Sequence, residues 1–328
     1  MLSLQRVCVP LNLDCNLHCR YCFRERERLD AVPGFTSEMI GYLNNLDSTK
    51  TEAVCAQGGE PLMHFERVKE LFSYVPKNVH KKVMSNCTLL TQEMVDYFND
   101  NDVELHASHD GAMTKFLRGV DILADDRICG LLRQVKLLRI FGVVTKYNND
   151  VWANFFDSAK KFGSTDFFYD TNPVWDIPSQ RDLVEGFDYG LWCDTFMQFR
   201  VSPFSHRIPW YGRKTLDIGK PKRAVGFSVL PNGRVCGMVN AYSDYGSIDD
   251  CFETCFWKLL ESGDMDACKT CKYLEDCFFP PQQCSSEHVR KCRVMFLDRR
   301  NADGWGKVRK YVYGHLDEIK KKYGYMGE

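Results

Sequence analysis

Short apolar runs alternate with amphipathic stretches along the first 200 residues. Residues 64–75, 92–99 and 149–162 place their apolar side chains on one helical face, and Thr91 is a candidate N-cap for the second of them. A further helix is expected at residues 181–199. The intervening runs are short, mostly apolar and often β-branched, as buried parallel strands are; they are residues 4–11, 52–57, 81–85, 103–108, 135–145 and 166–170. The pattern predicts repeated strand–helix units.

Six such units are too few to close an eight-stranded barrel, so we expect an α/β fold with an open, partial (β/α)6 barrel. In such folds the site lies at the C-terminal ends of the strands. A proline-containing stretch at 200–224 indicates a connector, and Pro231-Asn232-Gly233 between residues 225–230 and 234–238 indicates a hairpin. We therefore divide the chain into a barrel (1–199), a connector (200–224), a small Cys-rich domain (225–300) and a C-terminal helix (301–328).

Composition changes this picture mainly through cysteine, which is 16 of the 328 residues. A secreted disulfide scaffold is excluded because the chain is long, its core is amply apolar and its cysteines gather in two groups. Metal ligation in a reducing, oxygen-poor cytoplasm fits better. The net charge of −1 indicates no nucleic-acid partner, and neither a membrane-length apolar run nor a signal peptide is apparent.

The first cysteine group follows the first expected strand directly. Cys15, Cys19 and Cys22 form a Cys-x3-Cys-x2-Cys run, and three thiolates on one loop can hold three irons of a [4Fe–4S] cube. The fourth iron would then be open to a small molecule. Zinc prefers two separated cysteine pairs, and three uncoordinated thiols are disfavoured by such tight clustering.

This run, including Tyr21 before the third cysteine, resembles the cluster loop of radical S-adenosylmethionine (SAM) enzymes. The resemblance implies that the amino and carboxylate groups of SAM chelate the open iron. An electron, delivered by a flavodoxin- or ferredoxin-type donor, would then cleave SAM to methionine and a 5′-deoxyadenosyl radical.

Further segments after the expected strands resemble SAM-binding elements of the same family. Gln57-Gly58-Gly59-Glu60-Pro61 resembles the element that holds the SAM amino group, and its alternative is a plain turn. Ser85-Asn86-Cys87-Thr88 resembles a Thr-Asn-Gly-Thr segment, with Cys87 where glycine is usual. Ser108-His109-Asp110-Gly111 resembles a Ser-x-Asp-Gly segment that faces the ribose and substrate. The resemblance implies a SAM-binding set of Tyr21, Gly58, Gly59, Glu60, Pro61, Asn86, Ser108, Asp110 and Val144, with Arg118 a weak candidate for the SAM carboxylate. Val144, at the end of the fifth strand, is the candidate adenine contact, and a core role is the favoured alternative for it.

The second cysteine group resembles the SPASM extension of radical SAM enzymes. The resemblance implies two auxiliary [4Fe–4S] clusters, hence three clusters per chain. The inner cluster would use Cys236, Cys251 and Cys284, with an open iron or Cys255 as a further ligand; the outer one would use Cys268, Cys271, Cys277 and Cys292. Six residues separate Cys277 from Cys284 where the family has three. Structural zinc is the alternative, but seven cysteines do not supply two four-thiolate sites.

Catalytic acid–base residues are not fixed by the sequence. Asp110, Glu104 and Asp170 are candidates because they lie on or beside expected strands, and a structural carboxylate is the alternative for each. Residues 168–180, with Tyr169 and Asn172, are the candidate substrate loop.

The resemblance implies a peptide or protein substrate, which the radical would oxidise or crosslink. Little sequence precedes the first strand, so we expect a peptide to be recognised by the barrel or by a separate leader-binding protein. The alternatives are a small-molecule dehydrogenase, an enzyme like the anaerobic sulfatase maturases, and a non-catalytic iron–sulfur carrier or zinc scaffold. Residues 58–61 disfavour the last, because a carrier needs no site for the SAM amino group.

Overall fold

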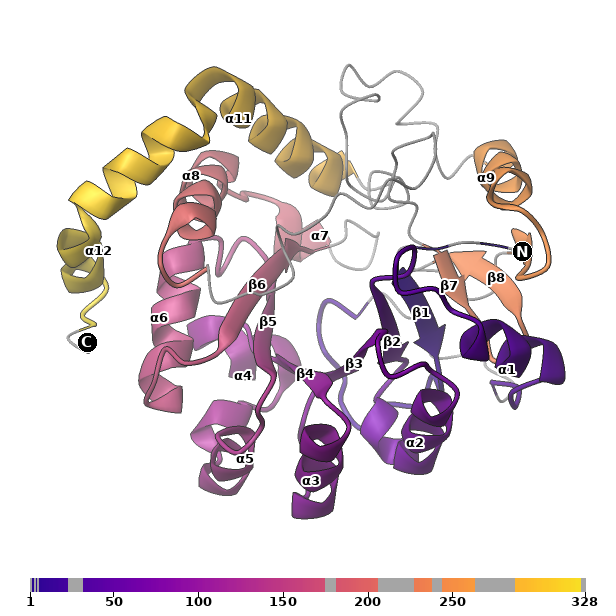
Figure 1. Cartoon of the computed structure of the whole chain (residues 1–328). Helices are drawn as coiled ribbons and strands as arrows, with labels where there is room; N and C mark the ends of the chain where they lie inside the picture. The colour runs from indigo at the N-terminus through magenta and orange to yellow at the C-terminus, as the bar shows by residue number, and fades with distance from the viewer. Residues whose placement is uncertain are drawn as a thin grey trace.

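The computed structural model describes residues 2, 4, 6–22, 32–174, 181–205, 227–237, 244–262 and 287–325. Within this part, the strands form one open sheet in the order β6-β5-β4-β3-β2-β1-β7-β8-β9 (Figure 1). Strands β1 to β6 are parallel, as expected for a partial barrel. The bounds are β1 Arg6–Pro10, β2 Ala53–Gln57, β3 His80–Ser85, β4 Val103–Ser108, β5 Leu138–Val144, β6 Phe168–Pro173, β7 Phe227–Val229, β8 Arg234–Gly237 and β9 Gly246–Ser247.

Helices cover the outer side of the curved sheet (Figure 1). The described helices are α1 Ser37–Asn44, α2 Phe65–Ser73, α3 Gln92–Asp100, α4 Thr114–Arg118, α5 Asp126–Leu132, α6 Val151–Phe162, α7 Arg181–Val184, α8 Tyr189–Val201, α9 Phe252–Glu261, α11 Glu287–Gly314 and α12 Leu316–Lys322, with 3-10 turns at Pro61–His64, Gly111–Met113 and Ile122–Ala124. Throughout the described segments, no helix is both long enough and apolar enough to span a bilayer.

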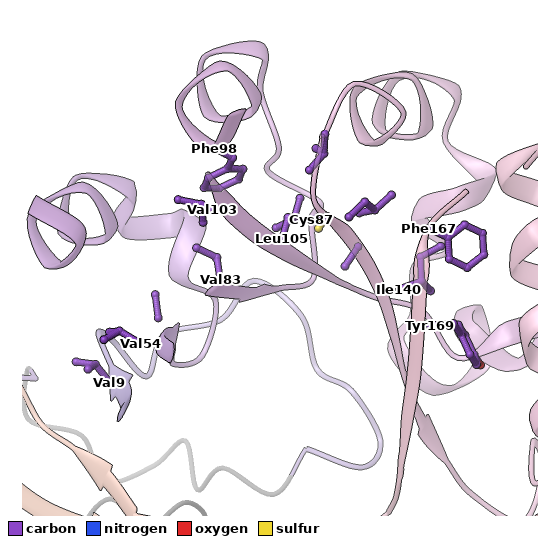
Figure 2. Packing of buried hydrophobic residues seen from close by; sticks show 14 of the residues in the cluster. Val9, Val54, Val83, Cys87, Phe98, Val103, Leu105, Ile140, Phe167 and Tyr169 are labelled. Carbon is purple, nitrogen blue, oxygen red and sulfur yellow. The ribbon is translucent and has the colours of Figure 1, made fainter. Parts of the chain in front are cut away.

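Side chains of the parallel strands alternate between two environments. Val83, Leu105 and Ile140 are fully buried and point toward the helices (Figure 2). Since successive side chains of a strand point to opposite faces, the residues between them face the concave side of the sheet. That side carries Lys82 and Arg139, among other polar residues. The sheet is therefore apolar on its helix-covered face and polar on its concave face.

The predicted strands, the hairpin and the Thr91 N-cap are confirmed, the strands with shifts of a few residues at their ends. Thr91 accepts a hydrogen bond from the Met94 amide, and Gly233 in the hairpin turn adopts a φ of 80°. Strand β7 also pairs in parallel with β1, and Ser228 on β7 lies opposite Cys8 on β1. The hairpin therefore extends the barrel sheet, although we expected a new domain to begin at residue 225.

The helices after β6 differ from the prediction. Residues 181–199 form two helices, because Gly186 takes a left-handed φ of 82° and Asp188 caps a new helix through the Leu191 amide. The C-terminal helix begins at Glu287, well before residue 301, and Gly304 interrupts it with a φ of 66°. The boundary at 300 thus falls inside a helix.

Candidate functional site

The loop after β1 is seated on the end of β2. The Gly59 amide donates to the Asn12 carbonyl at 3.0 Å, and the Glu60 amide donates to the Asp14 carbonyl at 2.7 Å. A Cβ on Gly59 would lie 1.9 Å from the Asp14 oxygen, and one on Gly58 would lie 2.3 Å from Asn12 Oδ1. These glycines are therefore needed for the close approach of the cysteine loop to this turn.

Glu60 ties the end of β2 to the end of β3. Its carboxylate is 1% exposed. Oε1 accepts from the Leu62 amide at 3.0 Å and from Ser85 Oγ at 2.7 Å, and Oε2 accepts from the Asn86 amide at 2.7 Å. Burial raises the pKa of Glu60 above its ordinary value, and these hydrogen bonds offset part of that shift. Three of its roughly four acceptor positions are used within the chain, which leaves only Oε2 for an ammonium group.

Asn86 supports the cysteine loop from the end of β3. Its Nδ2 donates to Asn16 Oδ1 at 2.9 Å and lies 3.8 Å from Cys15 Sγ, while its Oδ1 accepts from Thr88 Oγ1 at 2.6 Å. The next residue, Cys87, is fully buried and has a φ of 59°. The backbone thus keeps the left-handed shape that favours glycine even though cysteine stands there.

The three cysteines of the loop form no disulfide and are of intermediate exposure. The Cys22 amide donates to the Cys19 carbonyl in a tight turn, and the Leu17 amide lies 3.4 Å from Cys15 Sγ. Burial raises the pKa of the Cys19 thiol, and the nearby Arg118 guanidinium opposes this. Partly open thiols with N–H donors beside the sulfur suit an iron–sulfur cluster.

Among the described side chains, no three of His, Cys, Asp or Glu converge as ligands of one metal ion would. The donor set itself, three partly open thiols on one loop with N–H groups near the Cys15 sulfur, fits an iron–sulfur cluster.

Asp110 anchors the cysteine loop and is not a free base. It is fully buried and accepts from Tyr21 at 2.5 Å, from Arg118 Nε at 2.7 Å and Nη2 at 3.2 Å, and from the Val143 amide at 2.7 Å. Burial would lower the pKa of Arg118, but the Asp110 carboxylate raises it above its ordinary value. All four acceptor positions of Asp110 are occupied, so its predicted roles as catalytic base and ribose contact are not supported.

Two other predicted contacts also find other roles. Glu104 is the second residue of β4, near the end opposite the cysteine loop, and it accepts from Arg139 Nε at 2.5 Å and contacts His80 at 2.6 Å. Val144 is fully buried in the core between sheet and helices, which is the alternative the sequence left open. Glu104 is therefore corrected from catalytic candidate to structural ion pair, and Val144 from adenine contact to core residue.

Of the remaining candidates near β4 and β6, Ser108 and Asp170 are half-buried and Tyr169 is buried. Ser108 lies at the end of β4. Asp170 on β6 forms an ion pair with Arg200, with Oδ1 3.7 Å from Nη1. Tyr169, expected in the substrate loop, is 1% exposed and packs edge-on against Phe155 and Phe199. Residues 175–180 of that loop lie outside the described residues.

The auxiliary cysteines are described only in part. Cys236 is buried on β8, and Cys251 is exposed at the start of α9. Cys255 is buried with its Sγ 3.9 Å from the Ser247 carbonyl, and burial raises the pKa of its thiol to about 11. Cys292 is buried in α11, 3.9 Å from His288 Nε2. Cys268, Cys271, Cys277 and Cys284 lie outside the described residues.

The buried histidine beside Glu104 gives a pH prediction. Burial lowers the pKa of His106 to about 4, although Glu104 opposes the shift. In the unfolded chain the histidine pKa is about 6.5, so between pH 6.5 and 4 the unfolded state binds more protons than the folded state. The free energy of unfolding is therefore not reduced by His106 above pH 6.5 and falls as the pH drops toward 4. From pH 7 to 5 we expect His106 to remove on the order of 2 kcal/mol from the free energy of unfolding.

Guanidinium unfolding of the cluster-free protein at both pH values measures this loss. His106→Gln keeps an N–H donor for Glu104 and removes the titration, so this variant should lose correspondingly less stability. An equal loss in both proteins would show that His106 does not carry the effect.

Comparison with known proteins agrees with the fold. The family model described as "Radical SAM superfamily" matches residues 9–175, just over half of the chain. The solved structure of anSMEcpe with bound AdoMet is 17% identical, with a TM-score of 0.59 over 97% of this chain and 99% of that one. SuiB of Streptococcus suis bound to S-adenosylmethionine is 14% identical, with a TM-score of 0.58 over 85% of this chain and 73% of that one.

A curated relative is more similar in sequence over a shorter stretch. It is the uncharacterized protein MJ0907 of Methanocaldococcus jannaschii, 27% identical over 103 residues. The alignment spans 30% of this chain and 35% of that relative, so the shared region is about a third of either protein. Together with the extent of the family match, the cysteine loop and the parallel sheet, these findings establish that the chain belongs to the radical SAM superfamily.

Proposed function

We propose that this enzyme abstracts a hydrogen atom from a peptide or protein and thereby oxidises or crosslinks it. The observation that carries the proposal is the convergence of the loops after β1, β2 and β3 at the segment that bears the three cysteines. Cys15, Cys19 and Cys22 would hold a [4Fe–4S] cluster, which supplies the electron for reductive SAM cleavage when SAM is bound.

The chain's own residues would orient SAM beside that cluster. Glu60 Oε2 keeps one acceptor position for an ammonium group, and Pro61 fixes the backbone of the same turn. Ser108 is the half-buried hydroxyl nearest the end of β4 and suits a ribose contact. Arg118 would place its positive charge close to Cys19 and the SAM carboxylate. The Asp110–Arg118 ion pair, covered by Tyr21, would keep that charge fixed.

A peptide substrate is supported by analogy with the similar structures. anSMEcpe was also solved with a Cp18Cys peptide, and SuiB with the precursor peptide SuiA. We propose that the peptide enters at the concave face of the barrel, with a separate leader-binding protein as a further partner. A flavodoxin- or ferredoxin-type protein in an oxygen-poor cytoplasm would supply the electron.

Two auxiliary [4Fe–4S] clusters complete the proposal. Cys236 lies on β8, in the hairpin that extends the barrel sheet, and Cys251 comes after the hairpin and is exposed. With Cys284 they would hold the inner cluster, and Cys268, Cys271, Cys277 and Cys292 would hold the outer one. Cys255 is the weaker further ligand because its thiol already contacts the Ser247 carbonyl at 3.9 Å.

The iron content tests the number of clusters. After anaerobic reconstitution we expect about twelve irons per chain, from three four-iron clusters. A value near eight would mean that the Cys-rich region holds one cluster. A value near four would mean that it holds none, and zinc would then replace both auxiliary clusters. Zinc analysis of the same samples separates these outcomes.

Reductive SAM cleavage tests the function itself. The reconstituted enzyme, incubated with SAM and dithionite, should release 5′-deoxyadenosine, and deuterium from a labelled peptide substrate should appear in that product. Candidate peptides are best taken from short Cys- or aromatic-rich open reading frames beside the gene. Deuterium transfer from a small molecule instead of any peptide would favour the dehydrogenase alternative, and no cleavage at all would refute the proposal.

A further inference from the structure

The concave face of the barrel holds a buried group of charges that SAM binding does not use. It comprises Lys82 on β3, Glu104 and His106 on β4, Arg139 on β5 and His80 at the start of β3. Strand register brings them together, because Lys82 is opposite Glu104, and His106 is opposite Arg139. All face away from the helix-covered side.

Glu104 is already neutralised without Lys82. Oε1 accepts from Arg139 Nε at 2.5 Å and contacts His106 at 3.0 Å, and Oε2 contacts His80 at 2.6 Å. The side chains of Glu104 and Arg139 are each 1% exposed, so this ion pair is direct and desolvated. Even with both histidines neutral, the described members of this group include two cations, Lys82 and Arg139, and one carboxylate, Glu104.

Lys82 carries the excess charge. Its side chain is only 6% exposed, and its Nζ lies 3.8 Å from Glu104 Oε2, beyond hydrogen-bond distance. Within the described segments, the Lys82 ammonium makes no hydrogen bond. The adjacent Cys55 provides no counter-charge, because its hydrogen bond with Cys8 and its burial raise the pKa of that thiol well above the ordinary value. An ammonium on a side chain that is 6% exposed is only partly solvated, so an anion that reached it would gain a charge-assisted hydrogen bond.

We propose that Lys82 binds a carboxylate group of the substrate inside the barrel. Identifying this ligand with the substrate rests on the proposed function, whereas the carboxylate site rests on the charges alone. Lys82 lies three residues before the end of β3 at Ser85. At about 3.3 Å per residue, the carboxylate would lie roughly 10 Å below the edge that bears the cysteine loop. The substrate would thus carry its acidic group about that far from the reacting C–H bond.

Anaerobic equilibrium dialysis of the reconstituted enzyme tests the site with two matched pairs of labelled probes. Hexanoate is compared with hexanamide, and pentaalanine with its C-terminal amide. We expect at least one acid to bind and neither amide to do so. Because a charge-assisted hydrogen bond is lost, Lys82→Met should weaken binding of that acid by roughly tenfold or more.

Two further variants make the test specific. Lys82→Arg keeps the charge and should retain binding. Lys81→Met alters the neighbouring lysine, which shares the face of Val83 toward the helices, and should bind as the wild type does. Circular dichroism checks that each variant is folded, and the near-isosteric methionine leaves the Glu104–Arg139 pair in place.

The outcomes also separate the source of the carboxylate. Binding of pentaalanine alone assigns it to a peptide C-terminus, and binding of hexanoate alone assigns it to a small acid. Equal binding to wild type and Lys82→Met, equal binding of acids and amides, or no binding of either acid would overturn the inference. None of these results depends on SAM cleavage, so the proposed function stands or falls separately.

Discussion

Replacing Cys15, Cys19 or Cys22 by alanine is expected to abolish 5′-deoxyadenosine formation and to remove about four irons per chain. Each thiol lies on the same turn, and the Cys22 amide bonds to the Cys19 carbonyl, so loss of one ligand exposes the whole cube to dissociation. Iron analysis, the visible spectrum and chromatography of the SAM products measure the loss after anaerobic reconstitution.

Cys129→Ala is the matched control for these variants. Cys129 is a buried thiol on α5 that packs between the sheet and the helices. Its truncation should cost only packing energy and leave iron content and SAM cleavage close to wild type. Continued deoxyadenosine production in any variant of the loop cysteines would refute the assignment of the cluster to this loop, whatever the Cys-rich region binds.

The sequence predicted the barrel well because its strands are buried on the helix side by apolar residues. Strand β4, residues 103–108, has the predicted bounds, and its residues 103, 105 and 107 are all in the core. The helix α1, Ser37–Asn44, was not predicted. Its N-cap Thr36 follows a short loop signal, and only Met39, Tyr42 and Leu43 are buried, too few to mark a helical stripe.

The roles of site residues were harder to predict than their positions. The sequence placed Glu60, Asn86 and Asp110 at the ends of successive strands, and the structure confirms this placement. It could not show that Asp110 pairs with Arg118, eight residues along the chain, because that pairing depends on the turn and helix α4 between them and on the burial of both groups. Nor could spacing show that Asn16 bonds to Asn86 across two strands. Such contacts are tertiary and leave no periodic signal.

The position of the hairpin in the sheet could not be predicted from the sequence either. Proline and glycine signals around residue 231 correctly mark a turn, but they carry no information about the strand that lies beside it. The pairing of β7 with β1 places residues 227–237 next to the strand that leads into the cysteine loop. This neighbourhood matters for the proposed inner cluster, since Cys236 on β8 is then tied to the barrel sheet and is not carried by a separate body.

Gly59→Ala is expected to disrupt the site as severely as loss of a cysteine, though by a different route. The new methyl group would lie 1.9 Å from the Asp14 carbonyl oxygen and 2.5 Å from that of Leu13. Both contacts are with backbone, so the loop itself must move, and the hydrogen bonds from the Gly59 and Glu60 amides to that loop would break. We expect a loss of roughly 1–3 kcal/mol in the free energy of unfolding, typical of overpacking.

The displaced loop should also fail to retain its cluster, with iron content reduced by about four per chain and SAM cleavage near background. Guanidinium unfolding of the cluster-free protein separates the packing cost from cluster loss. Gly130→Ala is the control, because nothing lies within 4 Å of a Cβ there and the residue is inside helix α5. That variant should be stabilised by roughly 0.5–1 kcal/mol and should keep its iron. If Gly59→Ala instead retained full iron and activity, the close seating of the cysteine loop on β2 would not be what positions the cluster.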